Sequence, residues 1–88
     1  MKKLVVKINP FQRKQLIYIY DSEETIVPSV ETDLEKLNIT ISQLAQSEGV
    51  RRVDFAGPKS FALGMKRELE SIQKRLYNNE NNLEINII

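Results

Sequence analysis

The stretch Val53–Leu69, VDFAGPKSFALGMKREL, joins a short apolar segment to an amphipathic one through Gly57 and Pro58. Before this corner, apolar and polar residues alternate, which predicts a strand over 50–56. After it, apolar residues recur every three or four positions, which predicts a helix over 58–77. The apolar stripe of that helix consists of Phe61, Met65, Leu69, Ile72 and Leu76. The stretch therefore predicts a strand followed directly by a helix that packs back on it.

Other segments of the chain have the composition of strands. Residues 4–8 and 16–20 are rich in β-branched and aromatic side chains, as strands are. Residues 83–87 alternate between apolar and polar, as a half-buried or edge strand does. Residues 25–27 allow a short further strand, which Pro28 would confine to an edge because proline has no N–H to donate.

A first helix is predicted ahead of the strand at 50–56. Thr32 and Glu35 have the spacing of a capping box, in which each side chain bonds a free backbone amide at the helix start. Gly49 suits the left-handed residue just past the helix end. The apolar stripe between them consists of Leu34, Leu37, Ile41, Leu44 and Ala45.

The predicted order is strand, strand, short strand, helix, strand, helix, strand, or β-β-(β)-α-β-α-β. A helix that joins neighbouring parallel strands makes a right-handed crossover, and both crossovers step in the same direction along the sheet. Both helices are therefore expected on one face of a small mixed sheet. Because 88 residues supply one hydrophobic core, we predict a single α/β domain over 1–88.

This order resembles the first part of ribonuclease H-like domains, the group that includes actin-like ATPase halves and Holliday-junction resolvases. Nucleases of that group place an Asp in the first strand to hold a metal, whereas the first predicted strand here reads LVVKIN and has no carboxylate. Two-metal nucleases need several converging carboxylates, so the resemblance implies the fold and not the nuclease activity. The short chain, the missing His and Cys, and the Asn-rich segment 78–82 also resemble the style of small phage or prophage accessory proteins.

The composition excludes several kinds of chemistry. The chain has no Cys and no His, which removes thiolate nucleophiles, zinc-thiolate sites, the commonest general base and the commonest transition-metal ligand. No apolar run approaches the roughly 20 residues that span a bilayer, and the segment after Met1 has no signal-peptide core. We therefore predict a cytoplasmic protein without catalytic residues, metal or cofactor.

The sheet face opposite the helices is the strongest candidate binding surface. Side chains two positions apart share a face of a strand, so Leu16, Tyr18 and Tyr20 lie together, and Arg52 joins them from the strand at 50–56. An uncovered face with aromatic and mixed charged residues is typical of a protein interface. We predict that it binds a protein partner, most simply a second copy in a two-fold dimer. The alternative is a solvated face without a partner.

A second hypothesis for the same face is nucleic-acid binding. Bases would stack on the tyrosines, while Lys7, Arg13, Lys14 and Arg52 would contact phosphates. The net charge of +1 is no nucleic-acid signature by itself, so this hypothesis ranks below protein binding.

A third hypothesis concerns the corner at Gly57, Pro58, Lys59 and Ser60. Free amides at a helix start attract anions, and Lys59 would add a full positive charge. The segment lacks the GxxxxGKS/T pattern of a Walker A loop, and Pro58 has no N–H to offer a phosphate. The competing interpretation is a turn in which proline occupies the first helical turn. We favour that turn over an anion site at Gly57, Lys59 and Ser60.

Overall fold

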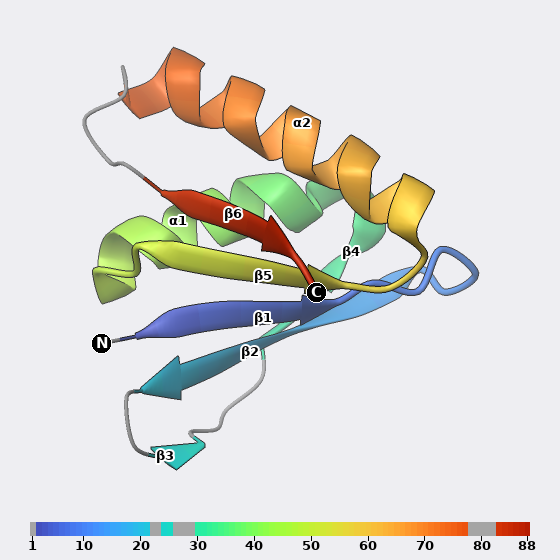
Figure 1. Cartoon of the computed structure of the whole chain (residues 1–88), viewed down its shortest axis with the longest axis horizontal. Coiled ribbons are helices and arrows are strands. Elements are labelled where there is room, and N and C mark those ends of the chain that lie inside the picture. Colours follow the sequence, from blue (N-terminus) through green and yellow to red (C-terminus); the bar gives the residue numbers. More distant parts are fainter. Residues whose placement is uncertain (1, 22–23, 26–29, 78–82) are drawn as a thin grey trace.

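The computed structural model describes residues 2–21, 24–25, 30–77 and 83–88 (Figure 1). Its strands are β1 (Lys3–Lys7), β2 (Lys14–Asp21), β3 (Glu24–Thr25), β4 (Val30–Asp33), β5 (Arg52–Ala56) and β6 (Glu84–Ile87). Its helices are the short 3₁₀ helix η1 (Leu34–Lys36), α1 (Leu37–Glu48) and α2 (Lys59–Tyr77). The predicted helices and the strands that flank them correspond to these elements, and β4 is an unpredicted addition.

The described strands form one six-stranded mixed sheet in the order β3-β2-β1-β5-β6, with β4 pairing on β2 beside this path. Strand β1 pairs antiparallel with β2 and parallel with β5. Strands β5 and β6 are also parallel, so β5, α2 and β6 form the predicted βαβ unit. The small mixed α/β sheet expected from the sequence is confirmed.

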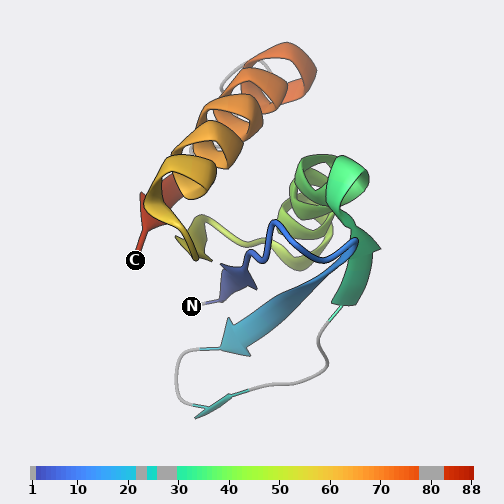
Figure 2. The ribbon, with the colours of Figure 1, turned by 90° about the vertical axis from the view of Figure 1, so that its right-hand side faces the viewer.

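Helices α1 and α2 both lie on one side of the sheet, as Figure 2 shows. Five of the strand side chains that point toward them are completely buried, those of Leu4, Val6, Ile17, Val53 and Phe55. The helices contribute an equally buried set, Leu37, Ile41, Ala62 and Leu69. These residues belong to one hydrophobic core between the sheet and the helices, which confirms that both helices cover one face.

The predicted capping box at Thr32 is wrong. Thr32 belongs to β4 and pairs with Gln15 of β2. The helical segment begins with η1 after Asp33, whose side chain makes no cap hydrogen bond. The Leu34 amide instead donates to the Arg13 carbonyl at 2.8 Å. Pairing with a distant strand therefore replaces the local cap that the residue spacing indicated.

The ends of two other predicted elements are also clear. Gly49 terminates α1 in the left-handed conformation, with φ of 67°, as predicted. Of the predicted strand at 25–27, Thr25 pairs with Tyr20 as part of β3. Residues 26–27 lie outside the described residues, as do Pro28, the Asn-rich segment 78–82 and the side chain of Leu76.

Candidate protein-binding sheet face

The side of the sheet that α1 and α2 do not cover carries a mixed aromatic and charged surface. Because alternate residues of a strand point to opposite faces, the strand pairing defines which side chains belong to this surface. We call it the open face, and it consists of Lys3, Val5, Lys7, Lys14, Leu16, Tyr18, Tyr20, Glu31, Asp33, Arg52, Asp54, Ala56, Glu84 and Asn86. The predicted interface residues Leu16, Tyr18, Tyr20 and Arg52 are all brought together here.

Two lysines of β1 lie over the two tyrosines of β2. Lys3 pairs directly with Tyr20, and its Nζ lies 5.9 Å from the centre of that ring. Lys7 reaches diagonally along the sheet, so that its Nζ lies 5.3 Å from the centre of the Tyr18 ring. Both distances are within the range of a cation–π contact. Each half-buried ring therefore already has an ammonium group on it.

A buried carboxylate lies at the centre of the open face. The side chain of Asp54 is only 2% exposed, although neither α1 nor α2 covers this face of the sheet. Its Oδ1 accepts from Arg52 Nε at 3.0 Å and from Asn86 Nδ2 at 3.4 Å, and its Oδ2 lies 3.6 Å from Lys3 Nζ. The hydrogen bond to Asp54 raises the pKa of the Arg52 guanidinium. Arg52 is thus engaged in neutralising Asp54.

The four cations proposed for phosphate contacts do not form one cluster. Lys7 lies on the open face beside Tyr18, and Arg52 is held by Asp54. Lys14 Nζ lies 2.9 Å from Asp33 Oδ1, and this hydrogen bond lowers the pKa of the Asp33 carboxyl. Arg13 belongs to the loop between β1 and β2. Two of the four are therefore paired with carboxylates.

One buried side chain holds the loop between β1 and β2. Gln15 is 1% exposed, and its Nε2 donates to the carbonyls of Asn9 at 2.8 Å and Gln12 at 2.7 Å. Its Oε1 accepts from the Asn9 amide at 2.7 Å. The Asn9 side chain in turn accepts from the Phe11 amide at 3.0 Å. This network orders a loop on which the Phe11 side chain is 93% exposed.

We expect Gln15→Leu to lower the free energy of unfolding, because the backbone groups of Asn9 and Gln12 lose their partner. The cost is about 1–3 kcal/mol for each of these groups that stays buried and unpaired. Leucine fills a similar volume but cannot bond the backbone of Asn9 or Gln12. Urea denaturation followed by circular dichroism measures the change. Gln12→Leu is the matched control, because the Gln12 side chain is exposed. Equal stability of the two variants would contradict the role assigned to Gln15.

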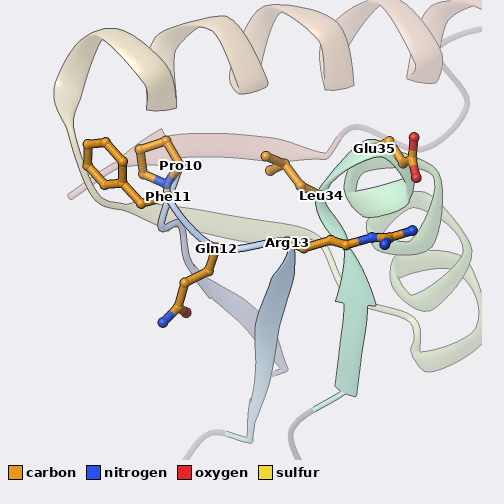
Figure 3. A pocket seen from close by; sticks show the side chains of 6 residues that line it. All are labelled: Pro10, Phe11, Gln12, Arg13, Leu34 and Glu35. Atoms are coloured by element: carbon orange, nitrogen blue, oxygen red, sulfur yellow. The ribbon is translucent and has the colours of Figure 1, made fainter.

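A shallow hollow of about 530 Å³ lies beside this loop. Figure 3 shows Pro10 and Phe11 at one end of it, Leu34 between, and Arg13 and Glu35 at the other end. Its lining is completed by Gln12, and the polar side chains among these residues are all exposed. The hollow therefore lacks the buried, convergent polar groups that orient a small ligand.

The corner at Gly57 is shaped by contact with β1. Gly57 has φ of 151°, and a Cβ added there would lie 2.7 Å from the Ile8 carbonyl oxygen. Ile8 is bound at this point because its amide donates to the Ala56 carbonyl at 2.7 Å. Lys59 and Ser60 are both exposed at the start of α2. The close approach of Ile8 thus explains why glycine occupies position 57, without an anion site.

Sequence reasoning did not foresee the roles of Asp54, Asn86 and Gln15. The alternation of residues places Asp54 and Asn86 on the same side as Arg52, but only the register between β5 and β6 brings Asn86 opposite Asp54. In the sequence Gln15 is simply a polar residue beside a predicted strand. Its burial depends on the path of the loop between β1 and β2. Local spacing contains no signal for either arrangement.

The described part of the chain holds neither a candidate metal site nor a candidate membrane-spanning helix. No group of three or more acidic side chains there lies close enough together to hold a metal ion. No described helix is both long and apolar enough to cross a membrane.

Comparisons with known proteins identify the fold. No protein-family model matches the sequence, and no curated protein matches it. A solved structure from Bacteroides thetaiotaomicron VPI-5482, described as a protein with an actin-like ATPase fold and unknown function, is similar with a TM-score of 0.66. The match covers 99% of this chain at 13% identity, and it spans 32% of that protein. It supports the predicted fold resemblance to ribonuclease H-like, actin-like modules, and at this identity it shows the fold alone.

Proposed function

We propose that this domain is a protein-binding module without catalytic activity, and that its open face associates with a second copy of the chain. The observation that carries the proposal is the combination of Leu16, Tyr18 and Tyr20 on a sheet surface that neither α1 nor α2 covers. Leu16 is 37% exposed and both tyrosines are half-buried. Tyrosine and apolar side chains surrounded by charged ones are typical of interface centres.

The charges of the open face favour a protein over a nucleic acid. The cations Lys3, Lys7, Lys14 and Arg52 share this surface with the acids Glu31, Asp33, Asp54 and Glu84. A phosphate backbone is bound by cations that are free to replace its counterions. Arg52 is held by Asp54, and Lys3 and Lys7 lie on the rings on which bases would have to stack. The surface is therefore better suited to a partner that carries both signs of charge.

A second copy satisfies that requirement. Lys3 and Lys7 of the open face lie on the central strand β1, whereas its exposed acids lie to both sides, Glu84 on β6 and Glu31 on β4 opposite Leu16. In a two-fold interface the same surface is used by both copies. A copy turned by 180° can thus set its Glu84 against Lys3 or Lys7 of the other, with the tyrosines buried between them.

We expect Leu16→Glu and Tyr18→Glu to weaken this association at least about thirtyfold, the change that the loss of about 2 kcal/mol at an interface centre produces. Light scattering coupled to size exclusion at micromolar concentrations measures the mass. Leu63→Glu on α2 is a matched control, since Leu63 is 40% exposed and Leu16 is 37% exposed. A wild-type chain that stays monomeric, or equal effects of Leu16→Glu and Leu63→Glu, would sink the proposal.

Nucleic-acid binding stays the alternative function of the open face, on which Lys7 is an exposed cation beside an aromatic side chain. Fluorescence anisotropy with single-stranded and duplex oligonucleotides tests it, because such binding falls steeply as salt is added. No binding at low salt would exclude it.

An anion at Gly57, Lys59 and Ser60 would shift the amide signals of Lys59 and Ser60 in an NMR titration with phosphate. A cytoplasmic location and a phage or prophage origin stay predictions from the sequence.

A further inference from the structure

Strand β6 has an outer edge on which no described strand pairs. It is the last strand in the order β3-β2-β1-β5-β6. The amide of Glu84 donates to the Arg51 carbonyl at 2.8 Å, and the amide of Ile88 donates to the Phe55 carbonyl at 2.9 Å. Because backbone groups of successive residues in a strand point to opposite sides, positions 84, 86 and 88 face β5. The backbone groups of Ile85 and Ile87 therefore point away from the sheet.

Apart from its short length of four residues, this strand lacks the sequence devices that normally prevent edge strands from pairing. Natural edge strands carry lysine, proline or a bulge that obstructs a neighbour, whereas the segment LEINII over 83–88 has one charge and no proline, lysine or glycine. Ile87 is half-buried, and Ile88 beside it is 64% exposed. The edge thus combines outward backbone groups with apolar side chains that retain exposed surface.

We infer that the outer edge of β6 pairs antiparallel with the same edge of a second copy, with the two-fold axis at Asn86. Ile85 of each copy then lies opposite Ile87 of the other, and each such pair exchanges both backbone hydrogen bonds. With the axis at Ile85, Leu83, which precedes β6, would have to take part. The axis at Asn86 uses both outward-facing residues within the strand.

The side chains support a second copy as the occupant. In this register Glu84 lies opposite Ile88 of the other copy, so no like charges meet. The isoleucines at 85 and 87 point to the helix side, where Ile85 is 8% exposed and already in the core. The partner's isoleucines would continue the same apolar row. Residues 84–88 of one copy are therefore complementary to residues 84–88 of the other when the two-fold axis passes through Asn86.

The pairing goes beyond the proposed function, because it uses the edge of the sheet and not the open face. A two-fold axis perpendicular to the sheet keeps the helices of both copies on one side. The two open faces then become one continuous surface on the opposite side. Association through the open face remains free to occur, so the two contacts can be tested separately.

The chain has no cysteine, so Asn86→Cys introduces a single thiol at the proposed axis. Opposite residues of a non-hydrogen-bonded antiparallel pair have Cα atoms about 4.5 Å apart, within the disulfide range of about 4.4–6.8 Å. We expect mild oxidation to convert Asn86→Cys largely to a dimer on a non-reducing gel. Glu84→Cys is the matched control, since the two copies of position 84 would be roughly 13 Å apart along the strand.

A second pair of variants separates edge pairing from chance contact. Ile87→Pro removes an outward amide and leaves those that face β5, whereas Ile87→Ala keeps the amide and loses a similar amount of side chain. In the Asn86→Cys background, cross-linking should persist with Ile87→Ala and be lost with Ile87→Pro. Without the cysteine, light scattering should show a lower mass for Ile87→Pro than for Ile87→Ala.

The outcomes distinguish this inference from the proposed function. Leu16→Glu should leave the Asn86→Cys cross-link intact, and only the combination of Leu16→Glu with Ile87→Pro should yield a monomer. Circular dichroism confirms that each variant is folded. A folded Asn86→Cys variant that does not cross-link, that cross-links no better than Glu84→Cys, or that cross-links equally with Ile87→Pro would overturn the edge pairing.

Discussion

Phe55→Ala is expected to lower the free energy of unfolding by about 3–5 kcal/mol, the usual cost of removing a buried phenylalanine. Phe55 is fully buried in β5, where it pairs with Val6 on one side and Ile87 on the other. Truncation would remove its contacts and leave a cavity between the sheet and the helices. Urea denaturation followed by circular dichroism gives the change in free energy.

Phe11→Ala is the matched control, because it is the same substitution at a side chain that is 93% exposed. Exposed positions away from special features change stability by about 0.5 kcal/mol or less. A loss of stability in Phe11→Ala that approached the loss in Phe55→Ala would contradict the core described above. A stable Phe11→Ala variant would also serve to test whether this ring contacts a partner.

Gly57→Ala is expected to destabilise the domain by at least about 1–3 kcal/mol, the cost of holding a side chain in a strained backbone conformation. The added Cβ would in addition lie 2.7 Å from the carbonyl oxygen of Ile8. The backbone of Ile8 cannot easily move away from the added Cβ, since the Ile8 amide donates a hydrogen bond of 2.7 Å to the Ala56 carbonyl. Urea denaturation again supplies the measurement.

Gly64→Ala separates this steric cost from the general effect of replacing glycine. Gly64 lies within α2, and a Cβ there would meet nothing within 4 Å. Alanine in a helix interior is favoured over glycine by about 0.8–1.0 kcal/mol, so this variant should be more stable than the natural protein. If Gly57 served only to bind an anion, Gly57→Ala would leave stability unchanged in the absence of phosphate.

Much of the fold follows from local patterns that act over a few residues. The alternation at Val53 and Phe55 predicts their strand, and the spacing of Phe61, Met65 and Leu69 predicts α2, because each element must bury its apolar side. Those patterns also predict that Leu16, Tyr18 and Tyr20 share a face. The capping box at Thr32 fails because a strand partner distant in the sequence satisfies that backbone.

The sequence by itself determined the type of most elements, the single core and the absence of thiol and imidazole chemistry. Only the tertiary structure decided the register that sets Val5 between Tyr18 and Asp54, the burial of Asp54 and Gln15, and the outward direction of Ile85 and Ile87. The physical reason is that helix and strand periodicity depend on neighbouring residues. Register, burial of a polar group and the position of a sheet edge depend on pairs of segments that meet only when the chain has folded.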